Sequence, residues 1–599
     1  MEQPIWRQYQ NNRMKKTKFE KQPVVKVEGR ARAAVEGWDA IADELLEAVK
    51  EKSNSRNIIV IETYQGVLFD DVLDQIRKRL LPAVVVESTD YMLSEESVRE
   101  MTRQDVTDDR IFGYMTRLRM DDFFEKENLT AIQQKVQAID TGTILVFGPG
   151  ATLIAPDSDI LVYADMARWE IQQRMRDNKV NNLGIGNKTE SMESKYKRGY
   201  FVDWRVCDRL KRQLYDKWDY LLDTNTMHQP KMVGGEAVRE GMREAAQRPF
   251  SVVPYFDAGP WGGQWMKEVC ELDPDHPNYA WSINCIPEEN SLLLEFGNTV
   301  VEMPSINVVF YQPIELLGHA VHGRFGAEFP IRFDFLDTMD GGNLSLQVHP
   351  TTDYIQQTFG MHYTQDESYY LMDAEDDASV YLGLKEGISP KEMMAELENA
   401  EETGDSFDDS KYINNWPAKK HDHFLIPAGT VHCSGRNSMV LEISSTPYIF
   451  TFKLYDWGRL GLDGKPRPIN IKHGKNVIQW DRDTKWVQEN LINRIEEVSR
   501  GDGWVEERTG LHEKEFLETR RHWFTQKVEH DTRGNLNVMN LVKGKEAVVE
   551  SPEGDFKPFV VHYAETFIIP ASVGKFTIRP YGKSEGEECA TIKAYVRVS

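Results

Sequence analysis

A short stretch of the chain, Leu344 to Pro350, carries two side chains that can bind a metal ion. It reads Leu-Ser-Leu-Gln-Val-His-Pro, and this strict alternation of apolar and polar residues predicts a β-strand. Because successive side chains of a strand point to opposite faces, Ser345, Gln347 and His349 are expected to share one face. Gln347 offers an amide carbonyl oxygen and His349 an imidazole nitrogen, which are both metal ligands.

Two later residues could complete the set of ligands. Glu367 lies in the stretch Gln-Asp-Glu-Ser-Tyr-Tyr, and His432 follows the turn Pro-Ala-Gly-Thr-Val. On successive strands of a small barrel, these groups could hold one divalent ion together with Gln347 and His349. Taken singly, a Gln-x-His pair or a histidine after such a turn more often has a structural role, so the joint pattern is what favours a metal site.

The composition sets the class of protein. With 599 residues and 40% hydrophobic residues, the chain is expected to form three or four domains with sizeable cores. A formal net charge of −24 argues against a nucleic-acid-binding protein, which should carry a basic patch. The five cysteines are scattered and form no Cys-x-x-Cys pair, so neither a disulfide framework nor a structural zinc knot is expected. We find no secretory signal and no membrane span, and we expect a soluble, cytoplasmic enzyme with no membrane partner.

The first half has the pattern of an α/β domain. Residues 1–50 are expected to be a polar extension that ends in a helix at 38–52. Apolar runs that predict buried strands then alternate with a helix at 70–80, which indicates a parallel sheet over residues 51–235. These runs are 58–61, 82–88, 143–150 and 160–165. Residues 224–249 are polar and are expected to link this domain to the second half.

The order of strand, glycine turn, helix and acid-ended strand resembles a P-loop kinase of the nucleoside-kinase type. A phosphate-binding loop needs a Gly-Lys-Ser/Thr sequence, whose backbone amides and lysine hold the phosphates. The turn at residues 62–70 has one glycine, no such lysine and two acids, Glu62 and Asp70. We therefore expect a degenerate kinase-like domain without phosphoryl transfer. The basic and aromatic segment 195–205 could bind a phosphorylated ligand, although an interface is the more ordinary reading.

The second half resembles the type I phosphomannose isomerases over residues 250–599. The resemblance rests on segments that occur in the family's order: Trp261-Gly262-Gly263, the Phe329-Pro330 strand, Ser345 to Pro350, the Glu367 strand, Pro427 to His432, Leu441-Glu442-Ile443 and Tyr455 to Arg459. It implies two mainly-β, cupin-like jelly-roll barrels. Residues 250–480 would form the metal-binding barrel, and residues 481–599 a second barrel without metal ligands.

The same resemblance implies an aldose–ketose isomerase that converts mannose 6-phosphate to fructose 6-phosphate through an enediol. Gln347, His349, Glu367 and His432 match the family's ligands for one zinc ion. Arg459 matches its active-site arginine, and Lys465 and Ser345 are candidates for binding the phosphorylated hexose. Glu442 is a candidate acid/base, with a buried structural carboxylate as the alternative.

One position departs from the family pattern. Two residues before the ligand Glu367 the family usually has a lysine, and this chain has Gln365. A neutral amide cannot replace a positioned charge near reacting oxygens, and such a loss can lower a rate by roughly 10²–10³-fold. A non-catalytic sensor of sugar phosphates is therefore a competing hypothesis. An active kinase in the first half is a third. The oligomeric state stays open.

Overall fold

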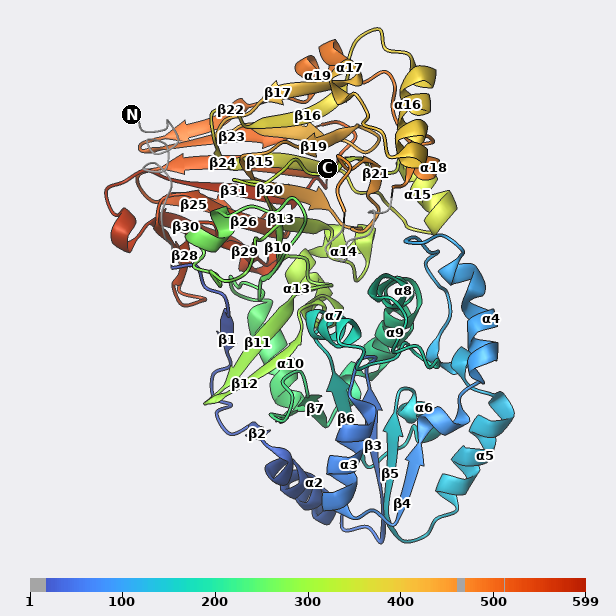
Figure 1. Ribbon diagram of the computed structural model, residues 1–599. Helices are drawn as coiled ribbons and strands as arrows, with labels where there is room; N and C mark the ends of the chain where they lie inside the picture. The colour runs from blue at the N-terminus through green and yellow to red at the C-terminus, as the bar shows by residue number, and fades with distance from the viewer. Residues whose placement is uncertain (1–17, 461–468, 511, 599) are drawn as a thin grey trace.

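The computed structural model describes residues 18–460, 469–510 and 512–598 (Figure 1). An α/β unit, blue to green in Figure 1, lies at one end, and stacked antiparallel sheets, whose strands run from green to red, lie at the other. This multidomain and mainly β architecture agrees with the predicted fold class. No helix within the described ranges has the length and apolar character needed to cross a bilayer.

A seven-stranded sheet organises the α/β unit, in the order β2-β8-β7-β6-β3-β5-β4. The strands are β2 (Ala34–Glu36), β3 (Arg56–Thr63), β4 (Val84–Glu87), β5 (Gly142–Gly148), β6 (Ile160–Asp165), β7 (Tyr220–Asp223) and β8 (Lys231–Gly234). Strands β3 to β7 are parallel, and β8 and β2 pair antiparallel at one edge. The central strand β3 is buried on both faces, which explains its continuous apolar run.

Helices cover this sheet and complete the α/β unit, which we define as the elements from β2 to α10. They are α2 (Trp38–Lys52), α3 (Phe69–Leu80), α4 (Glu95–Val106), α5 (Lys126–Gln137), α6 (Ala151–Ile154), α7 (Arg168–Arg176), α8 (Met192–Arg198), the π-helical turn η4 (Gly199–Asp203), α9 (Trp204–Leu214) and α10 (Gly235–Ala245). The helices predicted at 38–52 and 70–80 are confirmed. The expected link at 224–249 is wrong, because its residues form β8 and α10 of the unit.

The first barrel consists of two antiparallel sheets. The six-stranded sheet contains β9 (Tyr255–Asp257), β10 (Trp281–Cys285), β13 (Ile331–Asp337), β15 (Glu367–Ala374), β18 (His423–Ile426) and β20 (Ser438–Ser445). The five-stranded sheet contains β14 (Leu346–Val348), β16 (Ser379–Leu384), β17 (Ile413–Pro417), β19 (His432–Ser434) and β21 (Phe452–Tyr455). Helices α15 (Thr352–Phe359) and α16 (Pro390–Thr403) lie in its connections.

The second barrel follows the same plan. Its six-stranded sheet contains β22 (Glu496–Gly501), β23 (Trp504–Gly510), β24 (Leu517–Phe524), β26 (Asn537–Lys543), β29 (Thr566–Ile569) and β31 (Cys589–Val596). Its four-stranded sheet contains β25 (Val528–Asp531), β27 (Glu546–Glu550), β28 (Phe559–His562) and β30 (Lys575–Pro580). Alternate residues of β31 face different cores: Ile592 joins the main core, and Cys589 joins a separate cluster inside the second barrel.

A small third layer joins the α/β unit to the barrels. Strand β1 (Val24–Lys26) pairs in parallel with β11 (Ser291–Phe296), which forms a hairpin with β12 (Thr299–Pro304). The helices α12 (Ile306–Tyr311), α13 (Pro313–Leu317) and α14 (His319–Phe325) follow it. The segment before α2 therefore contributes strands to two sheets, because β1 pairs with β11 and β2 pairs with β8.

Candidate metal centre

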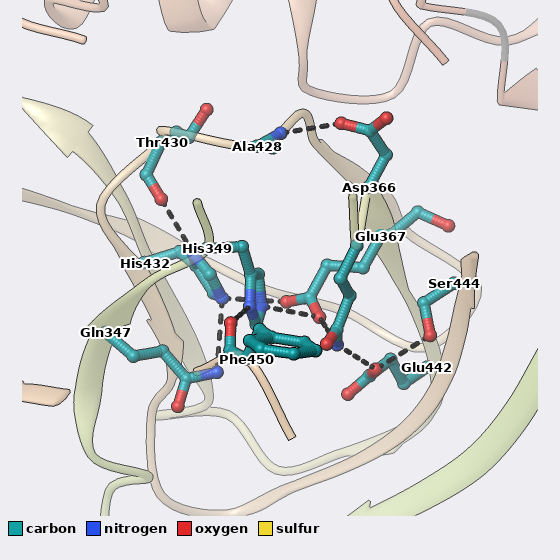
Figure 2. A network of polar contacts seen from close by, with 12 residues as sticks. Gln347, His349, Asp366, Glu367, Ala428, Thr430, His432, Glu442, Ser444 and Phe450 are labelled. Carbon is teal, nitrogen blue, oxygen red and sulfur yellow. Dashed lines mark hydrogen bonds and ion pairs between the residues drawn. The ribbon is translucent and has the colours of Figure 1, made fainter. Parts of the chain in front are cut away.

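The two sheets of the first barrel bring the four predicted ligand side chains together (Figure 2). Gln347 lies on β14, and its pairing partner on the neighbouring strand is His432 of β19. His349 follows β14, and Glu367 begins β15 in the opposite sheet. All four are buried, with exposed fractions from 0% for His432 to 7% for Gln347. The fold thus brings four side chains that are far apart in the sequence into one buried cluster.

A single carboxylate sits between the two imidazoles. Nε2 of His349 lies 2.9 Å from Oε2 of Glu367, and Nε2 of His432 lies 2.7 Å from Oε1. The carboxamide of Gln347 is 3.3 Å from Nε2 of His432. Burial raises the pKa of Glu367, but the two imidazoles outweigh burial and hold it well below its ordinary value.

Backbone carbonyls determine how the imidazoles point. Nδ1 of His349 donates to the carbonyl of Phe450 at 3.0 Å, and Nδ1 of His432 donates to that of Thr430 at 2.8 Å. In neutral imidazoles this leaves each Nε2 with a lone pair that faces the Glu367 carboxylate. A carboxylate that faces two lone pairs is unfavourable, so a cation between them, either a proton on each Nε2 or a metal ion, would satisfy all three groups. Two histidines oriented by carbonyls around a carboxylate are the usual arrangement of a divalent metal site, so these residues fit such an ion.

Glu442 lies beside this cluster on the inner face of the six-stranded sheet. Its pairing partners are Asp334 on β13 and Tyr369 on β15. Oε1 of Glu442 accepts hydrogen bonds from Ser444 Oγ at 3.0 Å and from Gln365 Nε2 at 3.3 Å. Burial, together with the carboxylates of Asp334 and Glu367, raises the pKa of Glu442 well above its ordinary value. A carboxyl group in this setting can hold a proton at neutral pH.

Arg332 supplies a largely buried cation, with 13% of its side chain exposed, that the sequence analysis missed. Its guanidinium donates to Asp334 at 3.2 Å and lies 3.6 Å from Oε1 of Glu442. Burial lowers the pKa of Arg332, but the carboxylates of Asp334, Glu442 and Glu367 outweigh it and keep the pKa above its ordinary value. A signal was present: Arg332 and Asp334 are two residues apart in an apolar strand, so both charges must face the same side.

Gln365, at the position of the family's lysine, spans the two carboxylates. Its Nε2 donates to Oε2 of Glu367 at 3.0 Å and to Glu442 at 3.3 Å. The side-chain oxygen of Gln365 and the hydroxyl of Tyr369 are buried and have no hydrogen-bond partner among the described residues. The cluster therefore still has polar atoms that a bound molecule could satisfy.

The predicted active-site Arg459 and the predicted substrate-binding Ser345 form a separate group. Nη2 of Arg459 donates to Oδ1 of Asp456 at 2.6 Å, and its Nη1 donates to the carbonyl of Asn343 at 2.5 Å. The Ser345 hydroxyl donates to the same Asp456 oxygen at 2.9 Å. The structure thus brings Arg459 and Ser345 together around Asp456. Lys465 lies outside the described residues.

The turn after β3, where a phosphate-binding loop would lie, is occupied by the protein's own groups. Gln65 donates to the carbonyl of Asn181 at 2.8 Å, and Arg174 donates to the carbonyl of Gly66 at 2.9 Å. Nearby, the carboxylate of Glu62 accepts the backbone N–H groups of Gly150 at 2.6 Å and of Thr152 at 2.9 Å. A crevice of about 640 Å³ opens at this edge of the sheet, with carboxylates such as Asp70 and Glu87 in its wall. None of these features favours a phosphate group.

The basic and aromatic segment 195–205 is buried rather than exposed to a ligand. Nζ of Lys195 donates to the carbonyl of Met175 at 2.5 Å and to Asn178 at 2.7 Å. Arg198 donates to Thr102 at 2.8 Å. Lys195 and Arg198 therefore satisfy groups within the α/β unit, while Arg205 pairs with Glu288 outside it at 3.1 Å.

Comparisons with known proteins bear on both parts of the chain. A family model described as a domain of unknown function (DUF8485) matches residues 37–247. The "Probable mannose-6-phosphate isomerase GmuF" of Bacillus subtilis is 27% identical over 233 residues, which cover 38% of this chain and 68% of that protein. A mannose-6-phosphate isomerase of Streptococcus mutans is 26% identical over 222 residues, covering 36% and 64%.

This chain is homologous to mannose-6-phosphate isomerases over part of its length. Among solved structures, the mannose 6-phosphate isomerase from Bacillus subtilis matches 58% of this chain and 100% of its own, with 18% identity and a TM-score of 0.48.

Proposed function

We propose that this protein is a metal-dependent isomerase that interconverts an aldose 6-phosphate and its ketose, with mannose 6-phosphate and fructose 6-phosphate as the pair. The observation that carries the proposal is the placement of Glu367 between the Nε2 atoms of His349 and His432, at 2.9 and 2.7 Å. The partial homology to mannose-6-phosphate isomerases supports a sugar phosphate as the substrate.

The metal is proposed to be zinc. Its ligands would be the imidazoles of His349 and His432, the carboxylate of Glu367 and the amide oxygen of Gln347, a mixture of nitrogen and oxygen donors that suits this ion. When bound, zinc supplies a Lewis acid that polarises the sugar carbonyl and stabilises negative charge on its oxygen.

Glu442 is proposed to move the proton between C1 and C2 of the sugar. A general acid/base works best when its pKa lies near the operating pH, and burial beside other carboxylates shifts the pKa of Glu442 upward from its ordinary range. The guanidinium of Arg332, 3.6 Å away, favours the ionised form of Glu442. Arg332 therefore lowers the pKa of Glu442, while burial and the neighbouring carboxylates raise it. Glu442 can therefore both accept and return a proton.

The phosphate group is proposed to bind near Arg459. This guanidinium is planar and permanently charged, so it can bind a phosphate through two hydrogen bonds. It now donates to Asp456, and a phosphate dianion would compete with that carboxylate. Ser345, which shares Asp456, would add a hydroxyl donor, and Lys465 a second cation.

Turnover of the zinc-loaded protein with mannose 6-phosphate tests this proposal. The parent protein is expected to form fructose 6-phosphate, and His432→Ala is expected to lose both zinc and activity. Glu442→Gln should keep zinc but lose about 10²–10⁴-fold in rate. His421→Asn, at a histidine whose Nδ1 contacts Tyr370 rather than the cluster, is the matched control and should keep both. A parent protein that binds zinc but converts no aldose 6-phosphate would refute the isomerase.

A non-catalytic sensor of sugar phosphates is the second candidate. It is favoured by Gln365, which offers a neutral amide to Glu367 and Glu442 where the resembling family has a lysine. A sensor predicts that mannose 6-phosphate raises the melting temperature without turnover. If no sugar phosphate shifts the melting temperature, the sensor is refuted as well.

A further inference from the structure

The connection between β20 and β21 contacts both the group of candidate metal ligands and the α/β unit. Its residues Tyr448, Ile449 and Phe450, which we call the Tyr448–Phe450 turn, precede β21. The carbonyl oxygen of Phe450 accepts the Nδ1 hydrogen of His349 at 3.0 Å, as Figure 2 shows. The position of this turn therefore decides how the imidazole of His349 is directed.

The α/β unit holds the side chain of Phe450. Phe450 is fully buried, and its ring centroid lies 5.9 Å from that of Phe201 and 6.5 Å from that of Tyr200, both in η4. A third ring, Phe112, stacks on it with a centroid distance of 6.1 Å. These three rings belong to the α/β unit, and a fourth, Phe359 at the end of α15 in the first barrel, lies 5.0 Å from Phe450 on a centroid basis.

Hydrogen bonds hold the other end of the turn. The hydroxyl of Tyr200 donates to the carbonyl of Tyr448 at 3.3 Å. The hydroxyl of Tyr448 donates to Glu289, which also accepts Nε2 of Gln172 from α7 at 2.5 Å. Tyr448 is thus bound directly by Tyr200 of η4, and it is linked to Gln172 of α7 through Glu289.

The backbone at the centre of the turn is strained. Ile449 has a φ of 81°, a left-handed conformation that a β-branched residue rarely adopts. Such a conformation persists only where the surrounding contacts over-determine it, and it is often found near functional sites. Here the contacts to Tyr448 and Phe450 on either side supply that constraint.

We infer that the α/β unit positions the metal ligand His349 through the Tyr448–Phe450 turn, with Tyr200 and Phe201 as positioning residues. This inference rests on the metal site of the proposed function. A carbonyl that accepts the second N–H of a ligating histidine fixes the ring and raises its basicity, and loss of such a partner weakens metal binding by about 10–100-fold. In this inference the α/β unit orients a metal ligand by packing, and it needs neither a bound nucleotide nor a catalytic residue.

The test measures zinc affinity of the full chain by competition with a chelator, and the visible absorption of the cobalt-substituted protein. Phe201→Leu removes the ring against Phe450, and Tyr200→Phe removes only the hydroxyl. Phe147→Leu is the matched control, because Phe147 is fully buried on β5 and its ring contacts Phe69 at 4.7 Å, inside the α/β sheet. All leucine variants lose core packing, so melting temperature alone does not distinguish the roles.

We expect Phe201→Leu to weaken zinc binding by about 10-fold and to change the cobalt spectrum, with a smaller change in the same direction for Tyr200→Phe. Phe147→Leu should lower the melting temperature and leave both metal readouts unchanged. If both η4 variants keep the parent's zinc affinity and cobalt spectrum, the inference is overturned. Tyr200→Phe decides the question if Phe201→Leu does not fold.

Zinc binding and isomerase turnover of the parent protein distinguish a failure of this inference from a failure of the proposed function. A parent that binds zinc without isomerising mannose 6-phosphate refutes the isomerase, while the effect of the η4 variants on zinc affinity still supports the positioning role. A parent that binds no zinc overturns both.

Discussion

Arg332 and Glu442 lie on neighbouring strands of one sheet, with the guanidinium 3.6 Å from the carboxylate, the Glu442 side chain buried and that of Arg332 13% exposed. This cation lies on the same inner face as Glu367, whose carboxylate contacts both histidines. The resembling family usually has a lysine at the position of Gln365. Arg332, on a different strand, is a candidate to supply that positive charge in this chain.

Replacement of Arg332 should therefore impair catalysis more than metal binding. Because the guanidinium does not contact the histidines or Gln347, Arg332→Gln should lower kcat by about 10²-fold and leave zinc affinity nearly unchanged. Steady-state kinetics and chelator competition on the same preparation measure the two effects. Arg332→Lys, which keeps a cation but loses the planar fork, should fall between parent and Gln variant. Full activity in Arg332→Gln would show that this cation is not needed.

Introducing a lysine at position 365 also tests whether the site needs a positive charge beside Glu367 and Glu442. In Gln365→Lys the ammonium would lie where the amide now donates to Glu367 and Glu442, at 3.0 and 3.3 Å. We expect turnover to rise by about 10-fold, because a charge stabilises developing oxyanions better than a neutral dipole does. Gln365→Met, which removes the dipole without adding charge, is the control and should not be faster than the parent. A slower lysine variant would indicate that Arg332 already supplies the charge.

Removal of the metal should destabilise the parent protein. A ligand that binds only the folded state adds RT ln(1 + [L]/Kd), about 2.7 kcal/mol at a free zinc concentration 100 times the Kd. A chelator should therefore lower the melting temperature of the zinc-loaded parent. In Glu367→Gln the central carboxylate is lost, and the chelator should have no effect. An unchanged melting temperature for a parent of verified zinc content would contradict this expectation.

His421 should make the fold sensitive to mild acid. Burial, and the nearby cations of Lys420 and Arg521, lower the pKa of His421 from 6.5 to about 3. As the pH falls below 6.5 the unfolded chain takes up this proton first, so stability is complete above pH 6.5 and declines progressively toward pH 3. This one group should cost about 1 kcal/mol of unfolding free energy at pH 5.5.

Urea unfolding at pH 7.5 and pH 5.5 measures that loss. His421→Asn is the suitable comparison, because φ at this position is 72° and asparagine tolerates the left-handed conformation. The variant does not titrate in this range, so it should lose less stability than the parent. The difference between the two proteins isolates His421 from other buried histidines such as His423, whose pKa is also lowered to about 3. An equal loss in both proteins would exclude His421 as the source.

The sequence by itself determined the types of the chemical groups and the local elements that carry them. Alternation around Gln347 and the apolar run at 58–61 predicted strands, because the period of side-chain burial follows from backbone geometry alone. Helix spacing placed α2 at its observed bounds. The set of four candidate ligands, by contrast, came from the resemblance to the type I phosphomannose isomerases, whose segments occur here in the same order.

Only the tertiary structure decided which of these groups meet. Arg332 and Glu442 are 110 positions apart in the chain, by subtraction of their residue numbers, and become neighbours because β13 pairs with β20. The contact of η4 with Phe450, and through it with His349, requires the α/β unit to dock against the first barrel. Local periodicity states which face of a strand a side chain occupies, but not what packs against that face. That is set by long-range packing, which places residues from remote segments around one buried carboxylate.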